Sequence, residues 1–237
     1  MTLPPVLILG MHRSGTSCLT GNLEEAGLYL GDVKRASPYN PKGNRENRAI
    51  MTLNEEVLNA NDSAWDAPPK DDTPVRWNTA HCAARDDVLA SYPDDKVWGF
   101  KDPRTLFTLD GWRAALPGAR LVGSVRHPLA VARSLHARSK KMPIEGGLAL
   151  WTAYNTRLLH LSRNGPVPLV CFDWPPERYL ESMSRLTQGL GLPPPEGGFS
   201  FFDPQLRRAT SDGDPLDAPL PGDMQALYDA LVSQVQI

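Results

Sequence analysis

An oxyanion-binding loop is encoded at residues 10–17, where the sequence reads Gly-Met-His-Arg-Ser-Gly-Thr-Ser. An apolar run precedes this segment and a helical pattern follows it. Glycines allow the backbone to wrap around a phosphate, the amide groups converge on it, and the following helix adds a favourable dipole. The glycines and the final hydroxyl have the spacing of a Walker A loop, but Thr16 stands at its lysine position. The cation of this loop is Arg13 instead.

A second anion-binding pair is predicted around residues 120–135. Arg126 ends an apolar segment typical of a buried strand, Pro128 opens a helical segment, and Ser134 follows two turns later. Proline is favoured at the first turn of a helix because its missing N–H is not needed there. An arginine and a serine at this spacing are common by chance. The pair indicates an anion-binding site only because a predicted strand precedes it and the loop at residues 10–17 is present.

Together these two segments resemble the family of sulfotransferases that use 3′-phosphoadenosine 5′-phosphosulfate (PAPS). Members carry Lys or Arg, then Ser-Gly-Thr, then Thr or Ser in the loop that holds the 5′-phosphosulfate. In this sequence the matching residues are Arg13, Ser14, Gly15, Thr16 and Ser17. Arg126 and Ser134 match the pair that holds the 3′-phosphate, while His127 stands where the family often has Asn or Asp. The resemblance implies PAPS as the donor, its 3′,5′-bisphosphate (PAP) as the product, and no metal ion.

A sulfonyl transfer needs a base for the incoming hydroxyl and cations for the charge that develops on the bridging oxygen. Glu46 is the candidate base, because the carbohydrate and tyrosylprotein branch of the family is similar in placing a glutamate just after its first helix. A glutamate also stabilises a helix N-terminus by its charge alone, which is the alternative reading. Other candidate bases are Glu55, Glu56 and His81.

Lys101 is the candidate second cation. It ends a predicted strand in Phe-Lys-Asp-Pro-Arg, a segment that resembles the Lys-Asp-Pro of the tyrosylprotein branch, where the lysine assists the leaving group. The carboxyl end of a strand is where α/β proteins place ligand-binding residues. The alternatives are a solvated lysine at the strand end, and an ion pair between Asp102 and Arg104 that merely fixes the loop.

Several further polar and aromatic residues have two possible roles each. His12 and His127 lie beside the two motifs and can either bond a phosphate or serve in packing and capping. Trp65, Trp77 and Trp98 can line an acceptor pocket, although packing in the core or a lid is the more common role of tryptophan. A cation from Arg207 or Arg208, within residues 201–208, is a candidate contact for the 3′-phosphate or the adenine.

The elements that must position these residues alternate between strands and helices. Apolar runs predict strands at 5–10, 96–101, 120–126 and 167–172. Helical patterns predict helices at 15–28, 46–59, 105–115, 128–140, 146–163, 175–190 and 222–235. A further helix is expected after the loop at 60–76, ending at about residue 91. This order predicts an α/β fold of three layers, α/β/α, with a central parallel sheet like that of P-loop NTPases. One domain is expected over residues 1–237, with 193–223 largely irregular.

Composition restricts the partners. A net charge of −2 gives no general basic excess, so we expect no nucleic-acid partner. The cysteines, Cys18, Cys82 and Cys171, are few and widely spaced, and the apolar run at 5–10 is too short for a signal peptide or a membrane span. These features predict a cytoplasmic protein with no membrane partner.

Three functions remain open from the sequence. The first is sulfonyl transfer from PAPS to a hydroxyl of a carbohydrate or small-molecule acceptor, with Glu46 as base and with Arg13 and Lys101 stabilising the leaving group. The second is a P-loop kinase that uses ATP, which the missing Walker lysine disfavours. The third is a non-catalytic nucleotide-binding protein, in which Glu46 lies away from the nucleotide. Acceptor selectivity is expected in loops 31–44, 60–76 and 193–223.

Overall fold

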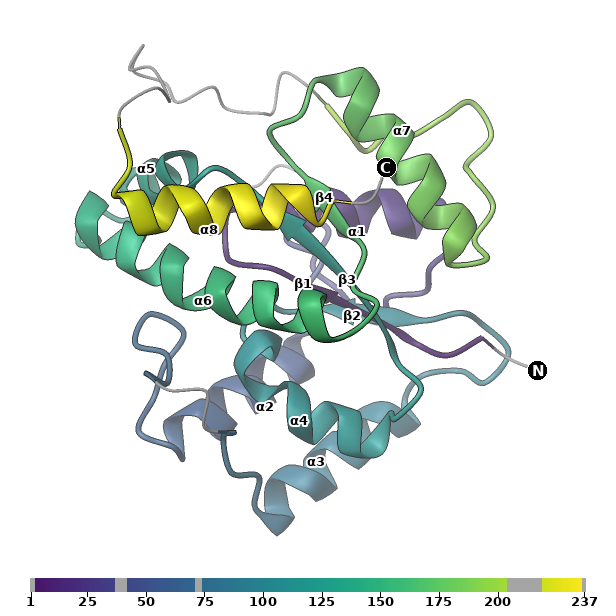
Figure 1. The fold of residues 1–237 in the computed structure, drawn as a ribbon. Helices are drawn as coiled ribbons and strands as arrows, with labels where there is room; N and C mark the ends of the chain where they lie inside the picture. Colours follow the sequence, from purple (N-terminus) through teal and green to yellow (C-terminus); the bar gives the residue numbers. More distant parts are fainter. Residues whose placement is uncertain (1–2, 37–41, 71–73, 204–218, 236–237) are drawn as a thin grey trace.

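The architecture is given by a computed structural model, which describes residues 3–36, 42–70, 74–203 and 219–235. Its centre is a sheet of four parallel strands in the order β2-β1-β3-β4 (Figure 1). The helices and strands of the described residues follow one another as β1 (Val6–Leu9), α1 (Thr16–Glu25), α2 (Arg48–Asn59), α3 (Thr79–Ala90), β2 (Gly99–Lys101), α4 (Thr105–Ala115), β3 (Arg120–Val125), α5 (Pro128–Arg138), α6 (Ile144–Asn164), β4 (Leu169–Cys171), α7 (Pro176–Gly189) and α8 (Gly222–Ser233).

The strands of the sheet are buried on both faces, as continuous apolar runs predict. β1 occupies a central position, pairing Ile8 with Lys101 of β2 and with Val122 of β3. β4 extends the sheet beside β3, where Val125 pairs with Cys171. Because all strands run in one direction, the residues that follow each strand emerge at the same edge of the sheet. This edge is where the predicted anion-binding residues must meet.

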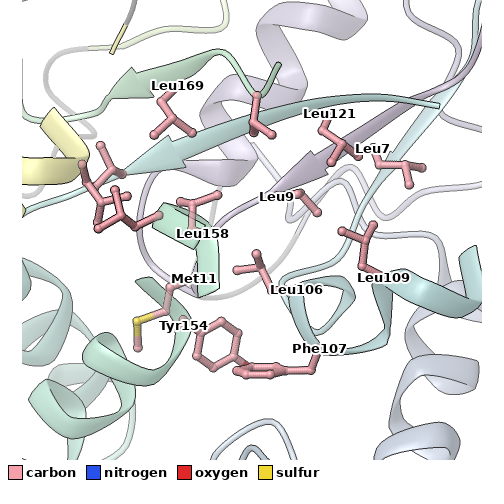
Figure 2. Packing of buried hydrophobic residues seen from close by; sticks show 14 of the residues in the cluster. Leu7, Leu9, Met11, Leu106, Phe107, Leu109, Leu121, Tyr154, Leu158 and Leu169 are labelled. Atoms are coloured by element: carbon pink, nitrogen blue, oxygen red, sulfur yellow. The ribbon is translucent and has the colours of Figure 1, made fainter. Parts of the chain in front are cut away.

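Alternate residues of β1 face two separate hydrophobic cores. Val6 and Ile8 pack in a core with side chains of α1 and α7. Leu7 and Leu9 pack in a larger core with side chains of α2, α4, α5, α6 and α8. Figure 2 shows part of the larger core, where Leu7, Leu9, Leu121 and Leu169 of the sheet lie over Leu106, Phe107 and Tyr154. The three-layer α/β/α architecture predicted from the sequence is confirmed.

Element boundaries differ from the predicted ones mostly by a few residues. The helix predicted from residue 46 begins at Arg48, because the side chain of Asn47 accepts bonds from the N–H groups of Ala49 and Ile50 and caps it. In the segment 193–223, residues 193–203 and 219–221 contain no helix or strand, and 204–218 lie outside the described residues. No helix among the described residues is long and apolar enough to cross a membrane.

Candidate functional site

A cavity of about 280 Å³ lies where the loop after β1 meets the ends of β2 and β3. This volume is close to the lower end of the range of about 300–1,000 Å³ usual for small-molecule sites. All of the predicted site residues except Ser14 line it. They are Arg13, Gly15, Thr16, Ser17, Glu46, Lys101, Arg126 and Ser134. The structure therefore brings together residues that are up to 121 positions apart in the sequence.

The loop after β1 has the backbone of an anion-binding turn. Gly10, Arg13 and Gly15 all have positive φ angles, of 134°, 67° and 84°. Gly15 precedes α1, whose N-terminus has no side-chain cap, and the first N–H groups of a helix have no partner within it. Since Gly15 to Cys18 line the cavity, the start of α1 offers these N–H groups and its dipole to an anion there. The loop thus fits a phosphate or phosphosulfate group.

Ser14 has a structural position in this loop. It is fully buried, and its carbonyl oxygen accepts a bond of 2.6 Å from the hydroxyl of Ser124 on β3. Ser14 is not among the residues that line the cavity, and its buried hydroxyl has no hydrogen-bond partner among the described residues. Its carbonyl group fastens the loop to the sheet, and its role in cofactor binding stays a prediction.

The two predicted anion-binding motifs touch each other. Arg13 Nε donates a bond of 2.8 Å to the hydroxyl of Ser134, and Arg126 donates one of 3.1 Å to the carbonyl oxygen of Arg13. Arg126 also lies 3.6 Å from the carboxylate of Asp173 and stacks over Phe172 at 5.2 Å. Asp173 and Phe172 follow β4, and the sequence analysis did not single them out. Their position after an apolar strand was the available signal.

Glu46 and Lys101 form an ion pair at the cavity wall. Lys101 Nζ lies 2.6 Å from Glu46 Oε1 and 3.5 Å from the hydroxyl of Ser17. The Lys101 side chain is only 2% exposed and that of Glu46 16% exposed. A buried ammonium needs such a partner, because an unpaired buried charge is strongly unfavourable. Lys101 is therefore not the solvated strand-end lysine of the alternative reading.

The other candidate bases lie away from the cavity lining. Glu55 forms an ion pair of 2.5 Å with Arg104, and Glu56 is exposed on α2. His81 completes a capping box with Asn78 at the start of α3. Of the four candidate bases, only Glu46 reaches the cavity.

A buried polar network joins the loop after β2 to α2 and α4. Asp102 pairs with Arg104 at 3.0 Å, as the alternative reading of this loop expected, and accepts a bond of 3.1 Å from Asn54. The oxygen of Asn54 in turn accepts bonds from Thr108 and Trp112, of 2.7 and 2.9 Å. Burial raises the pKa of Asp102, an effect that the charge of Arg104 opposes. The network fixes the loop that follows Lys101.

The cavity is locally basic although the chain is not. Six cations line it, namely Arg13, Lys42, Lys101, Arg104, Arg126 and Arg138, against the two carboxylates of Glu46 and Asp203. Lys42, Arg104 and Arg138 were not predicted as cavity residues, although Arg104 closely follows Lys101 and Arg138 lies one turn after Ser134 on α5. Across the described ranges, no three His, Cys, Asp or Glu side chains gather as a potential metal site.

The aromatic side chains on the cavity wall are phenylalanines, and the three tryptophans have the packing role that the sequence analysis gave as the more common one. Trp65 packs against His12 at 4.9 Å, and Trp98 stacks on Tyr92. Trp77 packs against Trp112, so all three tryptophans have packing roles. Phe172, Phe201 and Phe202 line the cavity instead.

The segment that carries Phe201 is fastened to Lys42 at the cavity wall. Lys42 Nζ donates bonds of 3.1 and 2.7 Å to the carbonyl oxygens of Ser200 and Phe201. Arg207 and Arg208, the predicted C-terminal cations, lie outside the described residues.

The two histidines beside the motifs have different positions. The backbone N–H of His127 donates a bond of 2.5 Å to Asp173, and the His127 ring packs against Tyr228, which agrees with a packing role. His12 lines the cavity. Burial, followed by the charges of Arg104 and Lys101, lowers the pKa of His12 well below its usual value.

Comparison with known sequences identifies one family, and comparison with solved structures shows a similar fold. A sequence profile described as "Sulfotransferase family" matches residues 4–181. The sulfotransferase domain of the olefin synthase from Synechococcus PCC 7002 has a similar structure, with a TM-score of 0.58, 20% identity, and coverage of 98% of this chain and 96% of that one. A sulfotransferase from Alicyclobacillus acidocaldarius gives a TM-score of 0.50, 14% identity, and coverage of 98% and 94%. No curated protein sequence matches the chain significantly.

Proposed function

Because the chain belongs to the sulfotransferase family, we propose that it transfers the sulfonyl group of PAPS to a hydroxyl of a carbohydrate or small-molecule acceptor. One observation carries the proposal: the loop after β1 and the Arg126–Ser134 pair meet at one basic cavity, joined by the bond from Arg13 to Ser134. The Glu46–Lys101 ion pair lies on the wall of the same cavity. Anion-binding groups and a carboxylate are the parts that this reaction needs.

The chemistry of the cavity fits the donor. Arg13 and the first residues of α1 would hold the 5′-phosphosulfate, since N–H groups and a guanidinium suit its oxygens. Arg126 and Ser134 would hold the 3′-phosphate. The rings of Phe172 and Phe201 offer aromatic faces against which a purine can stack.

In the proposed mechanism, Glu46 accepts the proton of the acceptor hydroxyl as its oxygen forms a bond to sulfur. The bond from sulfur to the bridging oxygen breaks, and the sulfonyl group passes to the acceptor. Arg13 and Lys101 stabilise the negative charge that is left on the phosphate. Lys101 also keeps the carboxylate of Glu46 at the cavity wall by their contact of 2.6 Å.

Two alternatives are weaker than this function. A kinase would need a cation at Thr16 and a free metal-binding aspartate, but Asp102 is fully buried and bonded to Arg104 and Asn54. A non-catalytic nucleotide-binding protein would require Glu46 to lie away from the nucleotide, whereas Glu46 lines the cavity. A sulfotransferase and a kinase are therefore separated most simply by which group they transfer, a sulfonyl group or a phosphoryl group.

Transfer can be tested with labelled donors. The protein is incubated with a mixture of small molecules from a cell extract and either ³⁵S-labelled PAPS or γ-³²P-labelled ATP with Mg²⁺. The proposal expects ³⁵S-labelled products that disappear with Glu46→Gln and persist with Glu56→Gln. Labelling from ATP alone would favour the kinase, and no labelled product from either donor would favour the non-catalytic protein.

The cellular setting follows from the cysteines. Cys18, Cys82 and Cys171 all carry free thiols in the structure, which suits a reducing compartment. We place the reaction in the cytoplasm on this basis.

A further inference from the structure

His12 is a polar group of the cavity wall that the proposed mechanism does not use. It stands directly before Arg13 in the loop after β1, and part of its surface lines the cavity. Its ring is held edge-on between Trp65, at 4.9 Å, and Tyr154, at 6.0 Å. The Tyr154 hydroxyl donates a bond of 2.9 Å to the carbonyl oxygen of Trp65, so these two neighbours are themselves fixed. The ring is thus held firmly at the cavity.

The imidazole of His12 lacks a hydrogen-bond partner within the described part of the chain. Its Nε2 atom is enclosed and has no bond to any described residue. Leaving a buried polar group unpaired costs about 1–3 kcal/mol. A ligand that supplied the missing bond would recover this free energy.

The charges around His12 define the ligand. The groups whose charges act on it are the cations Arg104, Lys101, Arg138 and Arg13. These charges and burial keep the imidazole neutral near pH 7, so it carries one N–H donor and one acceptor nitrogen. Arginine and lysine are donors only and cannot accept a bond from that N–H. A ligand that binds among these four cations is an anion, and because the oxygens of an anion only accept, such a ligand would pair with the N–H of the imidazole.

The same cations locate this anion on the donor. Arg13 and Lys101 are the residues proposed to stabilise the leaving phosphate, and both line the same cavity as His12. The group of the donor that must lie between these cations and Glu46 is the one transferred. A sulfonyl group presents three oxygens, all of them acceptors.

We propose that His12 binds the sulfonyl group of PAPS by donating a hydrogen bond from its neutral imidazole to a sulfonyl oxygen. This inference rests on the proposed function. The contact exists only with the donor, because the product PAP has lost the sulfonyl group. His12 would therefore distinguish donor from product, which favours exchange of PAP for PAPS after each turnover.

The test compares the dissociation constants of PAPS and PAP for the wild type, His12→Phe and His12→Asn. Phenylalanine keeps a flat ring between Trp65 and Tyr154 but removes the N–H, whereas asparagine keeps an N–H donor. We expect His12→Phe to weaken PAPS about tenfold or more, as for the loss of a bond to a charged group, and to leave PAP unchanged. His12→Asn should recover part of the affinity for PAPS. Met51→Leu alters the same cavity wall without a polar group and serves as the matched control.

Equal losses of affinity for PAPS and PAP would show that His12 only shapes the cavity. No loss of affinity for either nucleotide would show that His12 does not contact the ligand. If the variants do not fold, ¹⁵N spectra of the wild-type histidine rings decide the matter. The proposal expects PAPS, and not PAP, to produce the shift of a hydrogen-bonded N–H at His12, and equal spectra would overturn it. Wild-type protein that binds PAP no better than AMP would instead contradict the proposed function itself.

Discussion

The carboxylate of Glu46 has two tasks in the proposed reaction. It accepts the acceptor proton, and it is the counterion of Lys101, whose side chain is 2% exposed. Removing one partner of a buried ion pair leaves the other charge without compensation, which costs far more than the pair contributes. The activity and the stability of Glu46 variants must therefore be measured separately.

Glu46→Gln should lower the rate of sulfonyl transfer about 10²–10⁴-fold, the usual contribution of a general base. PAP affinity should change little, because the anion-binding groups remain in place. The measurements are single-turnover kinetics and a PAP titration of the same preparation, with thermal unfolding to correct for lost stability. Normal turnover by this variant would remove Glu46 as the base.

Arg13→Ala and Lys101→Ala should each slow transfer about 10²–10³-fold, the cost of losing one donor to a developing negative charge. The charge on the bridging oxygen grows only as the bond to sulfur breaks. Both substitutions should therefore lower the rate constant for transfer. Arg113→Ala, on α4 and outside the cavity lining, is the control cation and should behave as wild type. Equal slowing by all three variants would indicate a general effect of charge instead.

Stability should depend on pH through His12. Its pKa is lowered in the folded protein, so below pH ~6.5 the unfolded chain binds a proton that the folded chain does not. The free energy of unfolding of the wild type should therefore fall as the pH drops below this value, and His12→Phe should lose that part of the dependence. Denaturant unfolding of both proteins between pH 5 and pH 8 measures this difference. Parallel curves over the whole range would mean that His12 is protonated in both states or in neither.

At the scale of elements, the carboxyl edge of the parallel sheet explains most of the site. The loop after β1, Lys101 at the end of β2 and Arg126 after β3 emerge at this edge because the strands are parallel and adjacent. Strand and helix patterns therefore predicted not only the fold but also which polar residues would meet. The start of α2 was not predicted correctly: Asn47 caps this helix in the structure and leaves Glu46 ahead of it.

Helix α1 also supports the aromatic wall of the cavity. A Cβ atom added at Gly21 would lie 2.4 Å from the ring of Phe201. Alanine in place of glycine within a helix usually stabilises by about 0.5–1 kcal/mol. Gly21→Ala should give no such gain, because Phe201 must move, and it should weaken PAP binding.

The matched control is Gly189→Ala in α7, where an added Cβ meets nothing within 4 Å. This variant should be stabilised by up to about 1 kcal/mol with PAP binding unchanged. Denaturant unfolding and PAP titration of both variants provide the comparison. Stabilisation of both to the same degree would show that Phe201 does not depend on Gly21.

At the scale of the whole molecule, charge is distributed unevenly. The chain has a net charge of −2, yet six cations and two carboxylates line the cavity. Composition alone could not reveal this local excess of positive charge. Arg13, Lys101 and Arg126 were predictable because each lies in a local motif.

The remaining residues of the site had weaker signals in the sequence or none. Asp173 follows an apolar strand and Arg138 lies on the same helix as Ser134, but Lys42 reaches the cavity only through the packing of a distant segment. The same holds for the environment of His12, since Trp65 and Tyr154 come from different parts of the chain. Local patterns therefore predicted the residues that follow strands, whereas residues positioned by tertiary packing required the structure.

The most direct test of the central claim is a calorimetric titration of the protein with PAP, with AMP and ATP–Mg²⁺ as controls. A site built around Arg126 and Ser134 for a 3′-phosphate predicts that PAP binds, that AMP binds much more weakly, and that Arg126→Ala removes the difference. Preference for ATP–Mg²⁺, or equal binding of PAP and AMP, would contradict the assignment of a PAPS-dependent sulfotransferase.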